Sequence, residues 1–74
     1  MSKPTRITNS IRALRFARGE MTQAELAQRI GVTRQTVIAI EQGRYSPSLE
    51  VAFQIARVLK VPLDDVFQYP EGEA

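Results

Sequence analysis

The chain has 74 residues, of which 43% are hydrophobic and 24% charged, and its formal net charge is +2, so we expect one small domain. Cysteine and histidine are absent from the sequence, which excludes disulfides and cysteine-rich zinc sites and removes the usual general base; we therefore expect neither a metal nor a cofactor. No apolar run approaches the roughly 20 residues that cross a bilayer, and the first residues lack the apolar core of a signal peptide. We expect a cytoplasmic protein without a membrane partner or a small-molecule ligand.

The first helix is predicted over residues 10–18. Either Asn9 or Ser10 caps its start, and Gly19 follows its last residues, where a left-handed conformation ends a helix. Its apolar residues repeat at three-residue steps and are Ile11, Leu14 and Ala17.

The second helix is predicted to begin at Thr22. Thr22 and Glu25 have the spacing of a capping box, in which the threonine oxygen accepts from the amide of Glu25 and the carboxylate of Glu25 accepts from the amide of Thr22. Gly31 is placed to end this helix.

The third helix is predicted from Thr33, its cap, to about Gln42. Because only Val32 separates it from Gly31, the two helices must cross through a tight turn, and the small Ala27 suits their close approach. The inward-pointing apolar residues of both helices and the turn are Leu26, Ile30, Val32, Val37 and Ile40. This pattern predicts a helix-turn-helix over residues 23–42.

A fourth helix is predicted after Pro47, with Ser48 as its cap. We expect it to be the central helix, because its apolar stripe is wide. The stripe consists of Leu49, Val51, Ala52, Phe53, Ile55, Ala56, Val58 and Leu59.

The fifth helix is short, over residues 63–67 after Pro62, and Asp64 and Asp65 lie in its first turn, where the helix dipole favours negative charge. Residues 5–8 and 66–69 are rich in β-formers. They can pair as a small two-stranded antiparallel ribbon that joins the two ends of the chain, provided that the helices or a dimer support it.

Four segments together strongly resemble the XRE family, the lambda-repressor and Cro-like helix-turn-helix regulators. They are TQAELA at residues 22–27, GVTRQTV at 31–37, IEQGR at 40–44 and PSL at 47–49. The resemblance covers roughly residues 10–68 and implies an all-α fold, the compact five-helix lambda-repressor-like DNA-binding domain. The ending resembles the short stand-alone repressors of this family, which act as homodimers; we therefore predict a dimer interface that comprises Leu63, Val66, Phe67 and Tyr69.

Base contacts are predicted from the outer face and the first turn of the third helix, the end that enters the major groove in this motif. When the buried face is centred between Val37 and Ile40, Gln35 and Gln42 point away from the core. Arginine matches guanine and glutamine matches adenine. The predicted base-contacting residues are Thr33, Arg34, Gln35, Thr36, Ile38 and Ala39. For the polar residues the alternative is plain solvation, and for Ile38 it is a dimer contact or the edge of the core.

Phosphate contacts are predicted at the start of the second helix and around the end of the third. The first amides of a helix attract anions. The resemblance further implies that Gln23 braces both a phosphate and the recognition helix, and that Arg44 contacts the DNA backbone. The predicted phosphate-contacting residues are Thr22, Gln23, Gln42, Arg44, Tyr45 and Ser46.

The resemblance also implies a structural ion pair between Arg15 and Glu41. The loop at residues 19–21 is one residue longer than is common in the family, which leaves the register of the first helix open. Three other arginines are interpreted as solvated surface: Arg12, Arg18 and Arg29. Lys3 and Arg6 either form an arm that touches DNA or only support the ribbon.

The charge distribution agrees with a polyanion partner, since residues 1–48 hold eight of the ten basic side chains and three of the eight acidic ones. A solvated surface explains the charge alone equally well.

We divide the chain into an N-terminal arm or strand (1–9), the DNA-binding domain (10–69) and a frayed tail (70–74). We predict a transcriptional regulator, most simply a repressor, that binds double-stranded DNA at a near-palindromic operator as a homodimer. The alternative is a protein-interaction module such as an antitoxin, whereas an enzyme is disfavoured because so short a helical chain has little room for a pocket.

Overall fold

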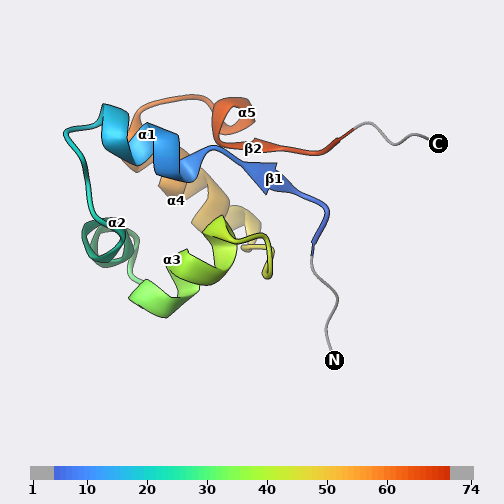
Figure 1. Ribbon diagram of the computed structural model, residues 1–74, viewed down its shortest axis with the longest axis horizontal. Coiled ribbons are helices and arrows are strands. Elements are labelled where there is room, and N and C mark those ends of the chain that lie inside the picture. The colour runs from blue at the N-terminus through green and yellow to red at the C-terminus, as the bar shows by residue number, and fades with distance from the viewer. Residues whose placement is uncertain (1–4, 71–74) are drawn as a thin grey trace.

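The computed structural model describes residues 5–70. Five helices and two short strands follow one another along these residues (Figure 1). In chain order they are β1 (Thr8–Asn9), α1 (Ile11–Ala17), α2 (Gln23–Ile30), α3 (Arg34–Glu41), α4 (Leu49–Leu59), α5 (Leu63–Val66) and β2 (Phe67–Gln68). The predicted fold class is therefore confirmed, and no helix within residues 5–70 is long and apolar enough to cross a membrane.

Local hydrogen bonds fix the starts of the helices as the sequence predicts. The capping box of α2 is complete: Thr22 Oγ1 accepts from the amide of Glu25 at 3.0 Å, and Glu25 Oε1 accepts from the amide of Thr22 at 2.8 Å. The caps of α3 and α4 are the predicted Thr33 and Ser48, each accepting from the third amide of its helix.

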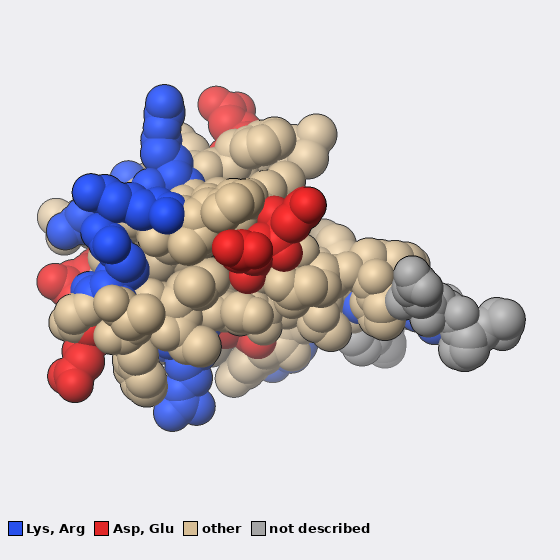
Figure 2. Space-filling model, turned by 90° about the horizontal axis from the view of Figure 1, so that it is seen from above, with Lys and Arg blue, Asp and Glu red and all other residues tan. Residues whose placement is uncertain are grey.

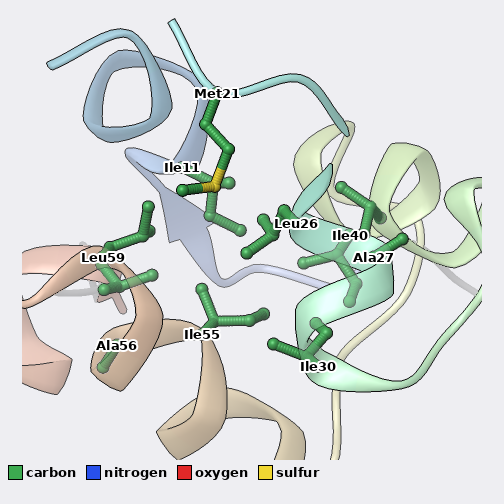
Figure 3. Close-up of a cluster of buried hydrophobic side chains, with 11 residues drawn as sticks. Ile11, Met21, Leu26, Ala27, Ile30, Ile40, Ile55, Ala56 and Leu59 are labelled. Carbon is green, nitrogen blue, oxygen red and sulfur yellow. The ribbon is translucent and has the colours of Figure 1, made fainter. Parts of the chain in front are cut away.

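The core lies between all five helices, with α4 passing through the middle of the molecule (Figures 1 and 3). The inward side of α1 consists of Ile11 and Arg15, with Leu14 partly buried against the core, while the predicted stripe residue Ala17 is exposed. The most buried side chains of the core are Ile11, Leu26, Val37, Ile40, Ile55, Leu59 and Val66.

Two residues of the predicted α4 stripe lie outside the core. Leu49 is 73% exposed and Phe53 is 57% exposed, whereas Ala52, Ile55, Ala56 and Leu59 are buried. The sequence stripe is wider than the arc that α2 and α5 cover, and the residues at its edge are left facing solvent.

The two ends of the described chain meet in an antiparallel ribbon, in which Thr8 pairs with Gln68 and Asn9 pairs with Phe67. The ribbon is shorter than predicted: residues 5–7 lie outside β1, and Val66 is the last residue of α5 and has no exposed surface. The prediction that Val66 belongs to a dimer interface is therefore wrong: this side chain is already covered within its own subunit. Lys3 and most of the predicted tail lie outside the described residues.

Candidate nucleic-acid interface

The helix-turn-helix is formed by α2, the turn at residues 31–33 and α3. Gly31 ends α2 with a φ of 77°, a left-handed conformation that glycine adopts without steric cost. The amide of Val32 then donates to the carbonyl of Ala27 at 3.0 Å. The turn thus needs few residues, and α3 packs across α2 with Val37 and Ile40 facing the core.

The outer face of α3 divides the predicted base-contacting residues into two groups. Thr33, Arg34 and Gln35 are exposed, whereas Thr36, Ile38 and Ala39 are half-buried. The hydroxyls of Thr33 and Thr36 lie 3.0 Å apart, and Thr33 also caps the helix. Arg34 and Gln35 are consequently the two side chains of this turn that are fully available to a ligand.

A groove of about 1130 Å³ lies between α1, the start of α2 and the two ends of α3, which contribute Arg34 and Glu41. It brings together four residues that the sequence analysis placed in the site: Thr22, Gln23, Arg34 and Gln42. The other predicted phosphate contacts, Arg44, Tyr45 and Ser46, are exposed on the α3–α4 loop and do not line this groove.

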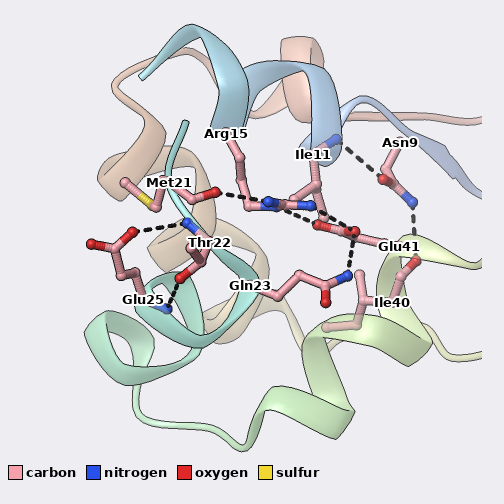
Figure 4. Close-up of polar contacts among 9 residues, drawn as sticks. All are labelled: Asn9, Ile11, Arg15, Met21, Thr22, Gln23, Glu25, Ile40 and Glu41. Carbon is pink, nitrogen blue, oxygen red and sulfur yellow. Dashed lines mark hydrogen bonds and ion pairs between the residues drawn. The ribbon is translucent and has the colours of Figure 1, made fainter. Parts of the chain in front are cut away.

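A buried polar network holds the floor of the groove (Figure 4). Arg15 Nε donates to Glu41 Oε2 at 2.7 Å, and Arg15 Nη1 donates to the carbonyl of Met21 at 2.7 Å. Gln23 Nε2 donates to Glu41 Oε1 at 3.0 Å. Both the implied ion pair and the implied contact of Gln23 with the recognition helix are therefore present, and the register of α1 is settled.

Asn9 is a functional candidate that sequence reasoning treated only as a cap. Its Oδ1 accepts from the amide of Ile11 at 3.2 Å, so Asn9 and not Ser10 supplies the side-chain cap of α1. Its Nδ2 donates to the carbonyl of Ile40 at 3.0 Å, which ties the ribbon to the last turn of α3 (Figure 4). The second contact joins residues 31 positions apart, so no local sequence pattern predicts it.

Arg12 and Phe16 also line the groove, although Arg12 was interpreted as solvated surface. The guanidinium carbon of Arg12 lies 5.6 Å from the centre of the Phe16 ring, within the range of a cation–π contact. Basic side chains gather at the end of the molecule near α1 and α2, where acidic side chains lie beside them, and further acidic side chains lie in the middle of the same face (Figure 2). The groove therefore has one wall that carries a positive charge held over an aromatic ring.

A recognition helix with exposed arginine and glutamine in its first turn, braced against two other helices, defines a helix-turn-helix DNA-binding domain. Residues 11–66 match the helix-turn-helix family model. The chain belongs to this family, the XRE-type helix-turn-helix transcriptional regulators, and not to a family of enzymes.

Named relatives come from archaea, bacteria and a phage. The chain is 51% identical to the uncharacterized HTH-type transcriptional regulator MJ0272 of Methanocaldococcus jannaschii over 72% of this chain and 80% of the relative. It is 44% identical to the uncharacterized HTH-type transcriptional regulator YgzD of Bacillus subtilis over 85% of this chain and 94% of the relative. It is 37% identical to the cryptic phage CTXphi transcriptional repressor RstR of Vibrio cholerae over 80% of this chain and 52% of that protein.

The fold is similar to that of a candidate DNA-binding protein from Bacteroides fragilis, known from a crystal structure. The two structures superpose with a TM-score of 0.73 at 22% sequence identity, over 84% of this chain and 98% of the other.

Proposed function

We propose that this transcriptional regulator is a sequence-specific repressor that binds a near-palindromic operator as a cytoplasmic homodimer, with α3 of each subunit in a major groove. The observation that carries the proposal is the first turn of α3, where Arg34 and Gln35 are exposed while the opposite side of the same helix is fixed by the core and by Glu41. A rigid helix that offers one forked cation and one amide suits direct reading of base edges.

The two exposed side chains have distinct targets. The guanidinium of Arg34 can donate to both acceptors of a guanine, and the amide of Gln35 can form a paired contact with adenine. Thr33, Thr36, Ile38 and Ala39 complete the base-facing side. Because the last three are half-buried, we assign them van der Waals contact, for example with thymine methyl groups, and leave the larger share of discrimination to Arg34 and Gln35.

The groove between α1, α2 and α3 would receive the sugar–phosphate backbone. Thr22 and Gln23 lie at the start of α2, where free amides and the helix dipole favour a phosphate, and Gln42 faces the same space. We add Arg12 to this set because it lines the groove. Arg44, Tyr45 and Ser46 would hold a second stretch of backbone from the α3–α4 loop.

A homodimer explains how a domain with one short reading helix selects a site. Two copies would place their α3 helices about 34 Å apart, in successive major grooves on one side of the duplex. Of the predicted interface residues, Leu63, Phe67 and Tyr69 keep exposed surface, and Tyr69 is 66% exposed.

Selection of binding sites from random duplexes with the purified protein tests the proposal. The expected product is an inverted repeat, and the selected duplex should be retained in a gel shift against excess unrelated DNA. Loss of all preference among sequences would overturn specific recognition. Transcription from a promoter that overlaps the selected site should fall when the protein is supplied, and a rise would overturn the assignment as a repressor.

A further inference from the structure

The outer face of α4 carries large apolar side chains that the fold leaves uncovered. Leu49 and Phe53 are 73% and 57% exposed, and they are one helical turn apart on the same side. Neither lines the groove between α1, α2 and α3, and neither is among the loop residues assigned to the DNA backbone, so the proposed DNA contacts do not account for them.

This apolar surface continues onto the start of α5. A shallow groove of about 680 Å³ lies between α4 and α5 and is lined by Phe53, Ala56, Val61, Pro62 and Leu63 together with three polar residues of α4. Leu63 is thus shared between this groove and the interface predicted from the sequence. A stable interface covers about 800 Å² per partner, and Leu63 of α5, which lines this groove, enlarges the face that α4 offers.

The three polar residues give the face a symmetric order. Glu50 and Arg57 lie seven residues apart, close to two helical turns, and Gln54 lies between them. All three are exposed. When a second α4 lies antiparallel to the first, Glu50 of each helix faces Arg57 of the other. Phe53 and Gln54 then lie in the middle of the contact.

We propose that this face of α4 and α5 binds the same face of a second copy of the chain across a two-fold axis. The α4 helices run antiparallel, Glu50 of each subunit pairs with the partner's Arg57, and Phe53 packs at the axis. The occupant is a second copy because the acid–apolar–base order is complementary to itself, which gives the isologous contact that a two-fold dimer needs. The inference rests on the proposed function. It places α4 at the centre of the dimer in place of the ribbon residue Phe67 and of Tyr69, which follows the ribbon.

Charge exchange at Glu50 and Arg57 tests the interface. Sedimentation of E50R and of R57E should show the dimer dissociation constant raised at least about tenfold, because two like-charge contacts replace two ion pairs. The double variant E50R/R57E should return to within about threefold of the wild type. Each exchange also opposes the dipole of α4, so a purely structural effect makes the double variant the weakest dimer, the opposite of the proposal. R29E, on α2, is the matched control and should leave the dimer unchanged.

A single introduced cysteine gives an independent test, since the chain contains none. Q54C, next to the axis, should form a disulfide-linked dimer under mild oxidation, whereas Q28C, at an exposed glutamine of α2, should stay uncrosslinked. A wild type that sediments as one copy at high micromolar concentration would overturn the interface, as would single exchanges that leave the dimer intact or a double exchange that fails to recover. A wild type that selects an inverted repeat while Q54C does not crosslink would overturn this interface and leave the proposed function standing.

Discussion

The Arg15 guanidinium and the Glu41 carboxylate form a two-point contact, with Nε to Oε2 at 2.7 Å and Nη2 to Oε1 at 3.2 Å. The two side chains are 7% and 9% exposed. One comes from α1 and the other from the last turn of α3, so the contact fixes the recognition helix against the rest of the domain.

Glu41→Ala should destabilise the protein by about 3 kcal/mol, because it leaves the buried Arg15 without its counter-charge and Gln23 without its acceptor. Urea unfolding followed by circular dichroism measures the change. Replacing both partners, as in R15M/E41L, should recover part of the loss, since a buried pair exchanged for apolar residues is often tolerated. If Glu41→Ala unfolds at the wild-type urea concentration, the contact has no structural role.

Arg34→Ala and Gln35→Ala should each weaken binding to the selected operator by about 1–3 kcal/mol and relax the preference at one base position of each half-site. Stability should stay unchanged because both side chains are exposed. Titration against operators changed at single positions locates the affected base. Arg29→Ala, which removes an exposed charge from the last turn of α2, serves as the control. Equal loss for all operators would contradict a base contact and indicate a phosphate contact instead.

Arg12→Ala should lower affinity for specific and unrelated duplexes alike and reduce the slope of log affinity against log salt by about 0.9 for each subunit bound. The reason is the position of Arg12 on the wall of the DNA-facing groove. Fluorescence anisotropy over a series of salt concentrations measures the slope. Arg18→Ala removes the same charge outside the groove; if both variants change the slope equally, the effect comes from net charge alone.

Asn9→Asp should lower the free energy of unfolding by about 1 kcal/mol. The substitution keeps the oxygen that accepts from Ile11 but replaces the amide that donates to the Ile40 carbonyl with a second acceptor. Thermal unfolding at neutral pH measures the change. Asn9→Ser retains a cap and a donor that is too short to reach α3, so the two variants should be similarly affected; a neutral Asn9→Ser would show that the tether to α3 is dispensable.

Local patterns predicted the parts of the fold that depend on neighbours in the chain. The capping box of Thr22 and Glu25 lies within four residues, and Gly31 ends a helix through its own conformation. The Arg15–Glu41 pair spans 26 positions and was accessible only through the resemblance, since no periodicity connects α1 with α3.

The differences among apolar residues have one physical origin: the sequence presents these residues as equivalent, and the fold buries only some of them. Phe53 and Ile55 both belong to the predicted stripe, yet only Ile55 faces the other helices. Val66 and Tyr69 both look like interface residues in the sequence. The second strand begins one residue after Val66, and Val66 is buried in the core whereas Tyr69 is exposed. Such choices depend on the angles at which helices pack.

The pairing of Thr8 with Gln68 brings the entry and exit of the described chain to one edge of the molecule. Segments joined directly to Thr8 and to Gln68 would consequently start from the same edge of the domain. A short linker across this edge would close the polypeptide into a ring, with a new opening in the exposed stretch around Tyr45 and Ser46.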